Sequence, residues 1–406
     1  MMHLYITGNS PGEIAGWVQP VCECLKEQDR DWQTTLIKTP CQYSSGTELG
    51  FARSLPSIDK VITLGSFLRN LYLSGRENLP APRRRTAVLY LGGDMFYAVL
   101  AARKLKAPLF CYTVKPRWAK HVRRFFVADE RMKQEFLARD VTPDKIEVVG
   151  QLSLDTLPLD TKREELFLRL TGSKKESDIV TFLPGSRPQY VDYMVPFFQD
   201  VADQLSRTIP GLRMILALSP FVPKERIFRA TGQDLPGDSK NLPDEIVSPS
   251  GCRIALVQKD ALAAMEISRL IVTIPGTNTL QAAGMGVPML VCLPLNKAEK
   301  IPLDGLAGLA LPSLYPFGLL KRALLLRKNR HVKFVALPNL IAQRAIVPEL
   351  RGCIEPAQVA DKVVSLLADQ ERRNRMSVDL KKLTSKRGAS NRIVRALISG
   401  LAAAEA

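Results

Sequence analysis

The chain has 406 residues, of which 46% are hydrophobic, and a formal net charge of +17. This length exceeds that of one ordinary hydrophobic core, so we expect two domains. The seven cysteines include no CxxC pair and the three histidines lie far apart, so we predict a reducing compartment, no disulfide framework and no metal site. No segment reaches about 18 uninterrupted apolar residues, and the first strand runs directly into a polar turn. We therefore expect neither a membrane-spanning helix nor a signal peptide.

Short apolar, β-branched runs recur along the chain and alternate with stretches of helical periodicity. The runs are 3–7, 34–38, 60–64, 86–92, 107–113, 124–129, 145–150, 178–184, 212–219, 252–258, 269–275, 287–294 and 333–337. Strands that are apolar throughout and alternate with helices are typical of parallel sheets covered on both faces. The sequence therefore predicts an α/β fold of two doubly wound, Rossmann-like domains that face each other across a cleft.

A polar, turn-rich stretch at 157–177 divides the strands into two groups. We place an N-terminal domain at 1–165 and a C-terminal domain at 175–370. The remaining residues, 371–406, are predicted to form a helical, basic tail that could pack back on the N-terminal domain.

Positive charge is concentrated in three stretches of the chain. Residues 103–124 carry eight lysines and arginines and no acid, 313–333 carry six and no acid, and 371–397 carry nine against two acids. Localised basic patches are typical of surfaces that meet phosphate, although solvated helix faces would explain part of this charge. No nucleic-acid-binding module is recognisable, so we expect no nucleic-acid partner.

Two strand-to-glycine turns predict a diphosphate site in the C-terminal domain. The first, Leu183-Pro-Gly-Ser-Arg187, contains Gly185 and Ser186 and ends in the Arg187 guanidinium. The second begins at Gly276 and opens a helix with the amides of Thr277, Asn278 and Thr279. Glycine permits a tight turn, while helix-terminal amides and a guanidinium suit phosphate oxygens. A glycine turn is common in parallel-sheet proteins for structural reasons alone, so the prediction depends on the pair.

Four motifs resemble, in order and spacing, those of bacterial lipid-A-disaccharide synthase. They are Gly8-Asn-Ser-Pro-Gly-Glu-Ile-Ala-Gly16, Leu183-Pro-Gly-Ser-Arg187, Pro275-Gly-Thr-Asn-Thr-Leu280 and Leu337-Pro-Asn-Leu-Ile-Ala-Gln-Arg-Ala-Ile-Val-Pro-Glu-Leu350. The resemblance covers most of the chain and implies a GT-B glycosyltransferase that needs no cofactor and no metal. It implies inverting transfer of an acyl-sugar from a UDP-sugar to a lipid or glycolipid acceptor. It also implies a cytoplasmic protein that associates peripherally with the inner face of the plasma membrane.

The resemblance implies that Asp94, within Leu91-Gly-Gly-Asp-Met-Phe96, is the catalytic base and that Glu13 orients the acceptor. An inverting transfer needs a carboxylate near the acceptor hydroxyl, and Asp94 follows an apolar strand, where sites of open sheets form. Alternatively, Asp94 only caps the helix that follows it, and Glu13 only caps its own helix.

On the donor side, the resemblance implies that Arg187 binds diphosphate and that Asn339 and Glu349 lie beside the nucleotide. Gln281 stands where the family has an acid that faces the ribose, and its amide can still form hydrogen bonds as a neutral partner. Arg187 could instead form a salt bridge at the turn, Asn339 could close a turn after Pro338, and Glu349 could cap a helix.

The sequence also departs from the family motifs at several positions. The replaced positions are Ala15, Trp17, Gln151, Tyr190, Pro275, Gln281 and Gly352. These replacements leave the donor sugar and the acceptor open. A nucleotide-sugar epimerase would bind the same UDP without a lipid-facing surface, and a catalytically inactive relative would only bind nucleotide or anionic surfaces.

Residues 306–330 mix leucine, tyrosine and phenylalanine with a basic flank. This pattern predicts a surface that inserts Leu319, Leu320 and Leu324 into an anionic membrane. The basic residues that would meet the headgroups are Lys321, Arg322, Arg327, Lys328 and Arg330. A buried helix with a basic rim and a homodimer interface fit the same pattern.

Overall fold

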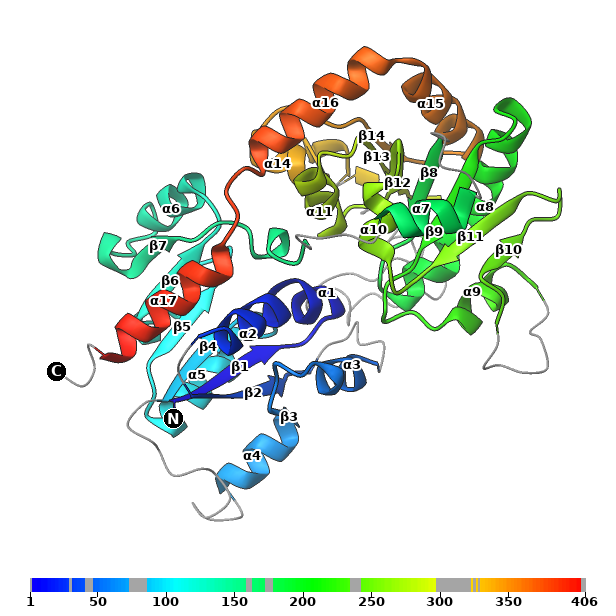
Figure 1. The fold of residues 1–406 in the computed structure, drawn as a ribbon. Helices are drawn as coiled ribbons and strands as arrows, with labels where there is room; N and C mark the ends of the chain where they lie inside the picture. Colours follow the sequence, from blue (N-terminus) through cyan, green and yellow to red (C-terminus); the bar gives the residue numbers. More distant parts are fainter. Residues whose placement is uncertain are drawn as a thin grey trace. The chain divides into compact units, whose positions relative to one another are not determined.

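The computed structural model describes residues 2–28, 31–40, 47–72, 86–157, 163–171, 178–233, 242–296, 323, 326–327 and 329–402. The chain forms two compact units (Figure 1). The first combines Met1–Thr156 with Lys386–Ala406, and the second is Leu157–Ser385. Leu319, Leu320, Leu324 and most of the segment 306–330 lie outside the described residues.

The first unit is built on a seven-stranded sheet in the order β3-β2-β1-β4-β5-β6-β7, with every neighbouring pair parallel. Its strands are β1 Met2–Gly8, β2 Trp32–Lys38, β3 Lys60–Thr63, β4 Thr86–Tyr90, β5 Leu109–Tyr112, β6 Arg124–Val127 and β7 Ile146–Val148. Its α-helices are α1 Pro11–Glu13, α2 Gln19–Lys26, α3 Glu48–Ser54, α4 Leu64–Tyr72, α5 Met95–Leu105, α6 Glu130–Leu137 and α17 Ala389–Ala402. A π-helical turn, Ile14–Val18, joins α1 to α2, and short 3₁₀ turns lie at Ala119–His121, Pro143–Lys145 and Leu152–Leu154.

Strand β1 is buried along its whole length because helices cover both faces of its sheet. Successive side chains of a strand point to opposite faces. Leu4 and Ile6 accordingly pack in one hydrophobic cluster with residues of α2 and α17, whereas Tyr5 packs in a second cluster with residues of α4 and α5. This burial on both faces explains why the strand reads as a continuous apolar run.

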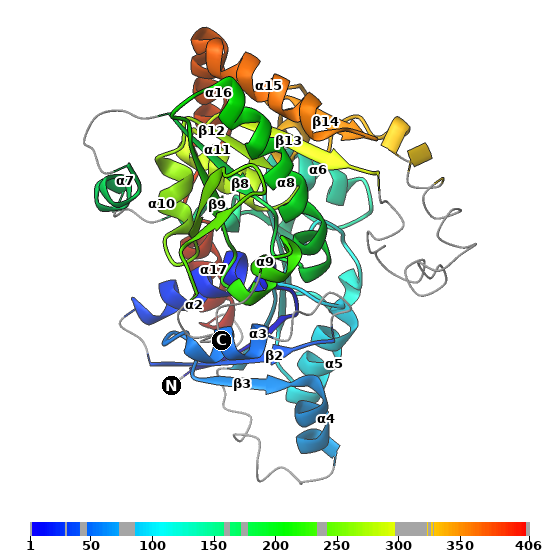
Figure 2. The same ribbon diagram turned by 90° about the vertical axis from the view of Figure 1, so that its right-hand side faces the viewer.

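The second unit has its own seven-stranded sheet, in the order β10-β11-β9-β8-β12-β13-β14. Only the edge strand β10 is antiparallel to its neighbour. The strands are β8 Ile179–Leu183, β9 Arg213–Ala217, β10 Glu245–Val247, β11 Arg253–Val257, β12 Leu270–Thr273, β13 Met289–Pro294 and β14 Glu349–Gly352. The helices are α7 Arg163–Thr171, α8 Pro188–Thr208, α9 Lys224–Ala230, α10 Ala261–Glu266, α11 Asn278–Met285, α14 Leu337–Ala342, α15 Pro356–Ala368 and α16 Gln370–Leu383. Helices α15 and α16 follow one another on this unit (Figure 2).

The two sheets, one parallel and one parallel except for its edge strand β10, confirm the predicted α/β class with two Rossmann-like units. The strand predicted at 333–337 is wrong, because α14 begins at Leu337 and the last strand, β14, begins at Glu349. The Glu349 carboxylate accepts hydrogen bonds from the amides of Val335 and Ala336, so these amides are not available to a neighbouring strand.

The stretch 371–406 contributes α16 to the second unit and α17 to the first. Asp155 anchors α17, because its carboxylate accepts hydrogen bonds from the amides of Gly388 at 2.7 Å and Ser390 at 2.6 Å. Ile393 and Leu397 are fully buried, so an amphipathic face holds α17 to the first unit. Among the described residues, no helix is both long and apolar enough to cross a bilayer.

Candidate active site

Each sheet reverses its winding direction between two neighbouring strands. In the first unit the reversal lies between β1 and β4, and in the second it lies between β8 and β12. Ligands of open α/β sheets bind outside the carboxyl ends of the strands at such points. Glu13 and Asp94 follow β1 and β4, and the two glycine turns follow β8 and β12. The topology therefore places the candidate residues of each unit at its expected ligand position.

Glu13 caps its own helix and also holds the neighbouring loop. Its carboxylate accepts hydrogen bonds from the amides of Asn9 at 3.0 Å and Ser10 at 3.2 Å, which completes a capping box with Ser10. Burial raises the pKa of Glu13, while hydrogen bonds from the backbone of Ser10, Asn9 and Gly93 act in the opposite direction. Glu13 therefore caps its own helix, which is one of the two roles considered from the sequence. The same carboxyl group also connects the β1–α1 loop to the β4–α5 loop.

Asp94 is the N-cap residue of α5 and its side chain is exposed. One carboxylate oxygen accepts a hydrogen bond from the Phe96 amide at 2.9 Å. In the described part of the chain, no donor reaches its other oxygen. The preceding loop is held by Tyr90, whose hydroxyl donates to the Gly93 carbonyl at 2.8 Å. Capping thus orients the carboxylate and leaves one oxygen able to accept a proton.

Gly92 is required at its position by the Glu13 carboxyl. A Cβ atom on Gly92 would lie 2.0 Å from Oε2 of Glu13 and 2.2 Å from its Cδ. We expect Gly92→Ala to lower the free energy of unfolding by about 1–3 kcal/mol, because Glu13 must leave the amides that it caps. Urea denaturation measures this loss. Gly50→Ala in α3 is the matched control, since its new Cβ would meet nothing within 4 Å, and an equal loss in both variants would contradict the prediction.

The two glycine turns of the second unit are neighbours. Gly185 has a φ of +95°, and a Cβ atom there would lie 2.7 Å from Cδ1 of Ile274, which lies between the end of β12 and the second turn. Strands β8 and β12 are parallel neighbours with Leu183 opposite Thr273, so both turns leave the same edge of the sheet. The two turns therefore lie side by side, as the prediction of a shared diphosphate site requires.

Arg187 follows the first turn as the N-cap residue of α8. Its guanidinium carbon lies 6.0 Å from the ring centre of Tyr190. Tyr190 is the residue that stands where the family motif has a glutamate. An aromatic face attracts a guanidinium through its ring electrons and does not neutralise its charge.

The second turn offers fewer amides than the sequence suggests. The Thr279 amide donates to the Gly276 carbonyl at 3.1 Å, and the buried Thr279 hydroxyl donates to the same oxygen at 2.7 Å. Asn278 donates through its side chain to the Thr273 hydroxyl at 2.7 Å. Within the described ranges, nothing accepts a hydrogen bond from the amides of Thr277 and Asn278. Two amides, not three, are therefore open at this helix end, and Gln281 lies one turn further along α11.

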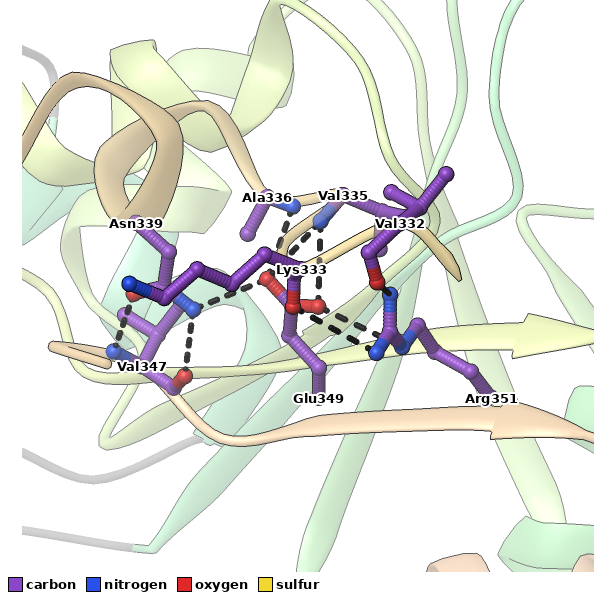
Figure 3. A network of polar contacts seen from close by, with 8 residues as sticks. All are labelled: Val332, Lys333, Val335, Ala336, Asn339, Val347, Glu349 and Arg351. Atoms are coloured by element: carbon purple, nitrogen blue, oxygen red, sulfur yellow. Dashed lines mark hydrogen bonds and ion pairs between the residues drawn. The ribbon is translucent and has the colours of Figure 1, made fainter. Parts of the chain in front are cut away.

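Asn339 and Glu349 belong to a closed polar network (Figure 3). The buried Asn339 side chain donates to the Val347 carbonyl and to Glu349, both at 2.8 Å, and accepts from the amides of Ile346 and Val347. A side-chain amide has two donor hydrogens and two acceptor positions, so that of Asn339 is saturated.

Glu349 is engaged almost as completely as Asn339. Besides Asn339, its carboxylate accepts hydrogen bonds from Val335 and Ala336, and Arg351 approaches it at 3.6 Å. The amides of Val335 and Ala336 lead directly into α14, so Glu349 caps this helix, as the sequence left open. We expect both residues to shape the loop beside the nucleotide, and a direct contact with the donor stays a prediction.

Removing the Asn339 side chain should therefore act on stability. Asn339→Ala leaves the amide and the carbonyl of Val347 without their partner, and leaves the Ile346 amide only its hydrogen bond to the Arg344 carbonyl. We expect the free energy of unfolding to fall by about 3 kcal/mol or more, as measured by urea denaturation. Gln233→Ala, which removes one exposed hydrogen bond to Val247, serves as the control and should cost about 1 kcal/mol or less. Equal losses of unfolding free energy in both variants would mean that the buried network stabilises the fold no more than one exposed hydrogen bond does.

Comparison with known proteins connects this geometry to one family. Residues 144–299 match the family model described as lipid-A-disaccharide synthetase. This range contains both glycine turns, whereas Glu13, Asp94, Asn339 and Glu349 lie outside it. Lipid-A-disaccharide synthase of Syntrophotalea carbinolica is 23% identical over 382 residues, which cover 91% of this chain and 86% of that protein. Lipid-A-disaccharide synthase of Syntrophus aciditrophicus is 24% identical over 310 residues, which cover 74% of this chain and 70% of that protein.

The chain is therefore similar, at low identity, to the lipid-A-disaccharide synthase family. Solved structures show that the chain shares its fold with other proteins. The S. aureus MnaA–UDP co-structure has a TM-score of 0.60 at 12% identity and covers 99% of this chain and 97% of that chain. A putative UDP-N-acetylglucosamine 2-epimerase from Listeria monocytogenes has a TM-score of 0.56 at 16% identity and covers 98% of this chain and 96% of that chain. At such identities the likeness concerns the GT-B type of fold alone.

Proposed function

We propose that the chain is an inverting glycosyltransferase that moves a sugar of the acyl-glucosamine type from a UDP-sugar to a lipid or glycolipid acceptor. The observation that carries this proposal is the position of the two glycine turns side by side at the carboxyl edge of the second sheet, where Gly185 lies against Ile274. Similarity to the lipid-A-disaccharide synthase family supports the choice of donor and acceptor.

The donor diphosphate binds at the two turns of the second unit in this proposal. The open amides of Thr277 and Asn278 and the guanidinium of Arg187 supply hydrogen bonds and positive charge to its oxygens. These groups stabilise the charge that develops on the UDP leaving group, and a divalent metal ion is not needed for this purpose.

The reaction itself is a single displacement. As the acceptor hydroxyl oxygen forms a bond to the anomeric carbon, the open carboxylate oxygen of Asp94 takes the hydroxyl proton. The bond between the anomeric carbon and the diphosphate oxygen breaks, and UDP departs with the bonding electrons. Attack opposite to the leaving group inverts the anomeric configuration. Glu13 acts as a positioning residue, because it holds the loop that carries Asp94.

The acceptor of this reaction would lie in a membrane. We therefore propose that the protein works at the inner face of the plasma membrane and binds it peripherally. Homodimer formation and independence of nucleic acid are further expectations from the sequence.

One assay separates the candidate functions. The protein is incubated with a UDP-sugar, with and without a lipid extract, and release of UDP and conversion of the sugar are both measured. Release of UDP that requires the lipid is the expected result. Conversion of the sugar without lipid would indicate an epimerase, and the absence of both reactions would indicate a binding protein without catalytic activity.

A further inference from the structure

Exposed hydrophobic side chains gather on two neighbouring segments of the first unit, which are the first turn of α5 and the loop after β5. Of the six large hydrophobic residues that are exposed in the described part of the chain, three lie here: Phe96 at 47%, Val114 at 58% and Trp118 at 44%. The ring centres of Phe96 and Trp118 are 6.0 Å apart. Phe96 follows β4 and Val114 follows β5, and these strands are parallel neighbours, so both segments leave the same edge of the sheet.

The loop after β5 holds Trp118 in an unusual backbone conformation. Trp118 has a φ of 56° and a ψ of 32°, in the left-handed region that residues with a side chain rarely adopt. Hydrogen bonds within the loop, from the amide of His121 to the Trp118 carbonyl at 2.8 Å and from the amide of Arg117 to the Lys115 carbonyl at 2.9 Å, maintain this arrangement. An exposed aromatic residue in a strained conformation contributes little to a core, which favours a binding role.

The same loop is strongly basic. Lys115, Arg117, Lys120 and Arg123 are exposed, and no Asp or Glu occurs between Asp94 and Asp129 in the sequence. None of these four cations forms an ion pair with another described residue. The hydrophobic side chains are therefore flanked by positive charge without a counter-ion.

We propose that the surface formed by Phe96, Val114, Trp118 and the four cations, here the interfacial surface, docks the chain on an anionic lipid bilayer. Tryptophan and phenylalanine favour the level of the lipid headgroups, and basic residues are attracted to an anionic leaflet. Rings and cations could also bind single-stranded nucleic acid, but the aliphatic Val114 offers no stacking to a base.

The position of the interfacial surface connects it to the candidate catalytic base. Phe96, the first apolar residue of this surface, lies two residues after the proposed base Asp94. The Phe96 amide also donates a hydrogen bond to the Asp94 carboxylate. This proposal rests on the lipid-linked acceptor of the proposed function, because docking here would bring the first unit to the membrane in which that acceptor lies. It is a different surface from 306–330, which stays a separate prediction.

Vesicle sedimentation with the full chain tests the proposal. The vesicles contain phosphatidylcholine alone or phosphatidylcholine mixed with phosphatidylglycerol, and neither donor nor acceptor is added. Binding should require phosphatidylglycerol. Lys115→Gln combined with Lys120→Gln should lower the partition coefficient roughly 25-fold, at about five-fold for each charge. Val114→Ser combined with Trp118→Ser should lower it roughly ten-fold or more and abolish the part of the binding that survives high salt.

Matched substitutions on α16 control for charge and hydrophobicity. Arg375→Gln combined with Lys382→Gln, and Val378→Ser, alter exposed residues of the second unit and should leave binding unchanged. Quenching of tryptophan fluorescence by lipids brominated on their acyl chains gives a second readout. This quenching should disappear in Trp118→Ser, although Trp17 and Trp32 remain.

Several results would overturn the interfacial surface. They are equal binding to both kinds of vesicle, unchanged binding in the two surface variants, equal losses in the α16 controls, or binding to a single-stranded oligonucleotide but not to vesicles. Because these assays contain no donor, a failure here leaves the proposed transfer reaction intact. A failure of the UDP-release assay, in turn, leaves the vesicle result unaffected.

Discussion

Asp94→Asn is expected to lower the turnover number by about 100-fold or more, with little change in stability or in the affinity for UDP. Asparagine is as good an N-cap residue as aspartate, so its side-chain oxygen can still accept the hydrogen bond from the Phe96 amide. The amide cannot take a proton from the acceptor hydroxyl. The substitution therefore separates capping from proton transfer, and initial rates of UDP release at saturating donor and acceptor measure the difference.

Asp129→Asn is a matched control for this experiment. Asp129 is the N-cap residue of α6 and accepts a hydrogen bond from the Met132 amide at 2.8 Å. It follows β6 in the same sheet, but at a distance from the winding reversal between β1 and β4. Its variant should keep the wild-type turnover number. If Asp94→Asn also stays within a few-fold of wild type, Asp94 is a cap only and another group is the base.

The fold class could be predicted from the sequence alone because apolar, β-branched runs recur along the chain and alternate with helical stretches. Runs such as 3–7 and 178–184 are mainly apolar, and the strands within them are buried along their whole length because helices cover both faces of the sheet. The run at 333–337 has the same composition but is not a strand. Its amides bond to the carboxylate of Glu349, and this partner lies too far along the chain for a local pattern to indicate it.

The glycine turns of the candidate site could be predicted from the sequence. Which of its hydrogen-bonding groups remain without an acceptor in the protein could not. The sequence indicates that Gly276 turns the chain, but the burial of Thr279 and the saturation of Asn339 depend on packing. Gly92 was not predicted to be required at its position. The Gly-Gly pair before Asp94 was the available signal, because it marks a loop that another group approaches closely.

The structure provides a physical explanation for the replacement of the family's glutamate by Tyr190. In the sequence it is a lost glutamate, which counts against the family activity. In the structure its ring faces the Arg187 guanidinium at 6.0 Å. A carboxylate at this position would compete with a diphosphate for the arginine, whereas a ring does not. The replacement is therefore compatible with anion binding.

Arg187→Ala is accordingly expected to weaken UDP binding by about 1.5–3 kcal/mol, the contribution of a hydrogen bond to a charged group. This corresponds to an increase in Kd of roughly 10- to 150-fold, which isothermal titration calorimetry can measure. Arg226→Ala is the matched control, since Arg226 pairs with Asp192 on α8 of the same unit and its replacement should leave the Kd for UDP unchanged.

Chelation of divalent metal ions by EDTA should also leave the wild-type Kd unchanged, because the guanidinium and the amides of Thr277 and Asn278 supply the positive potential. An unchanged Kd in Arg187→Ala, or a loss of binding in EDTA, would place the diphosphate elsewhere or make it depend on a metal.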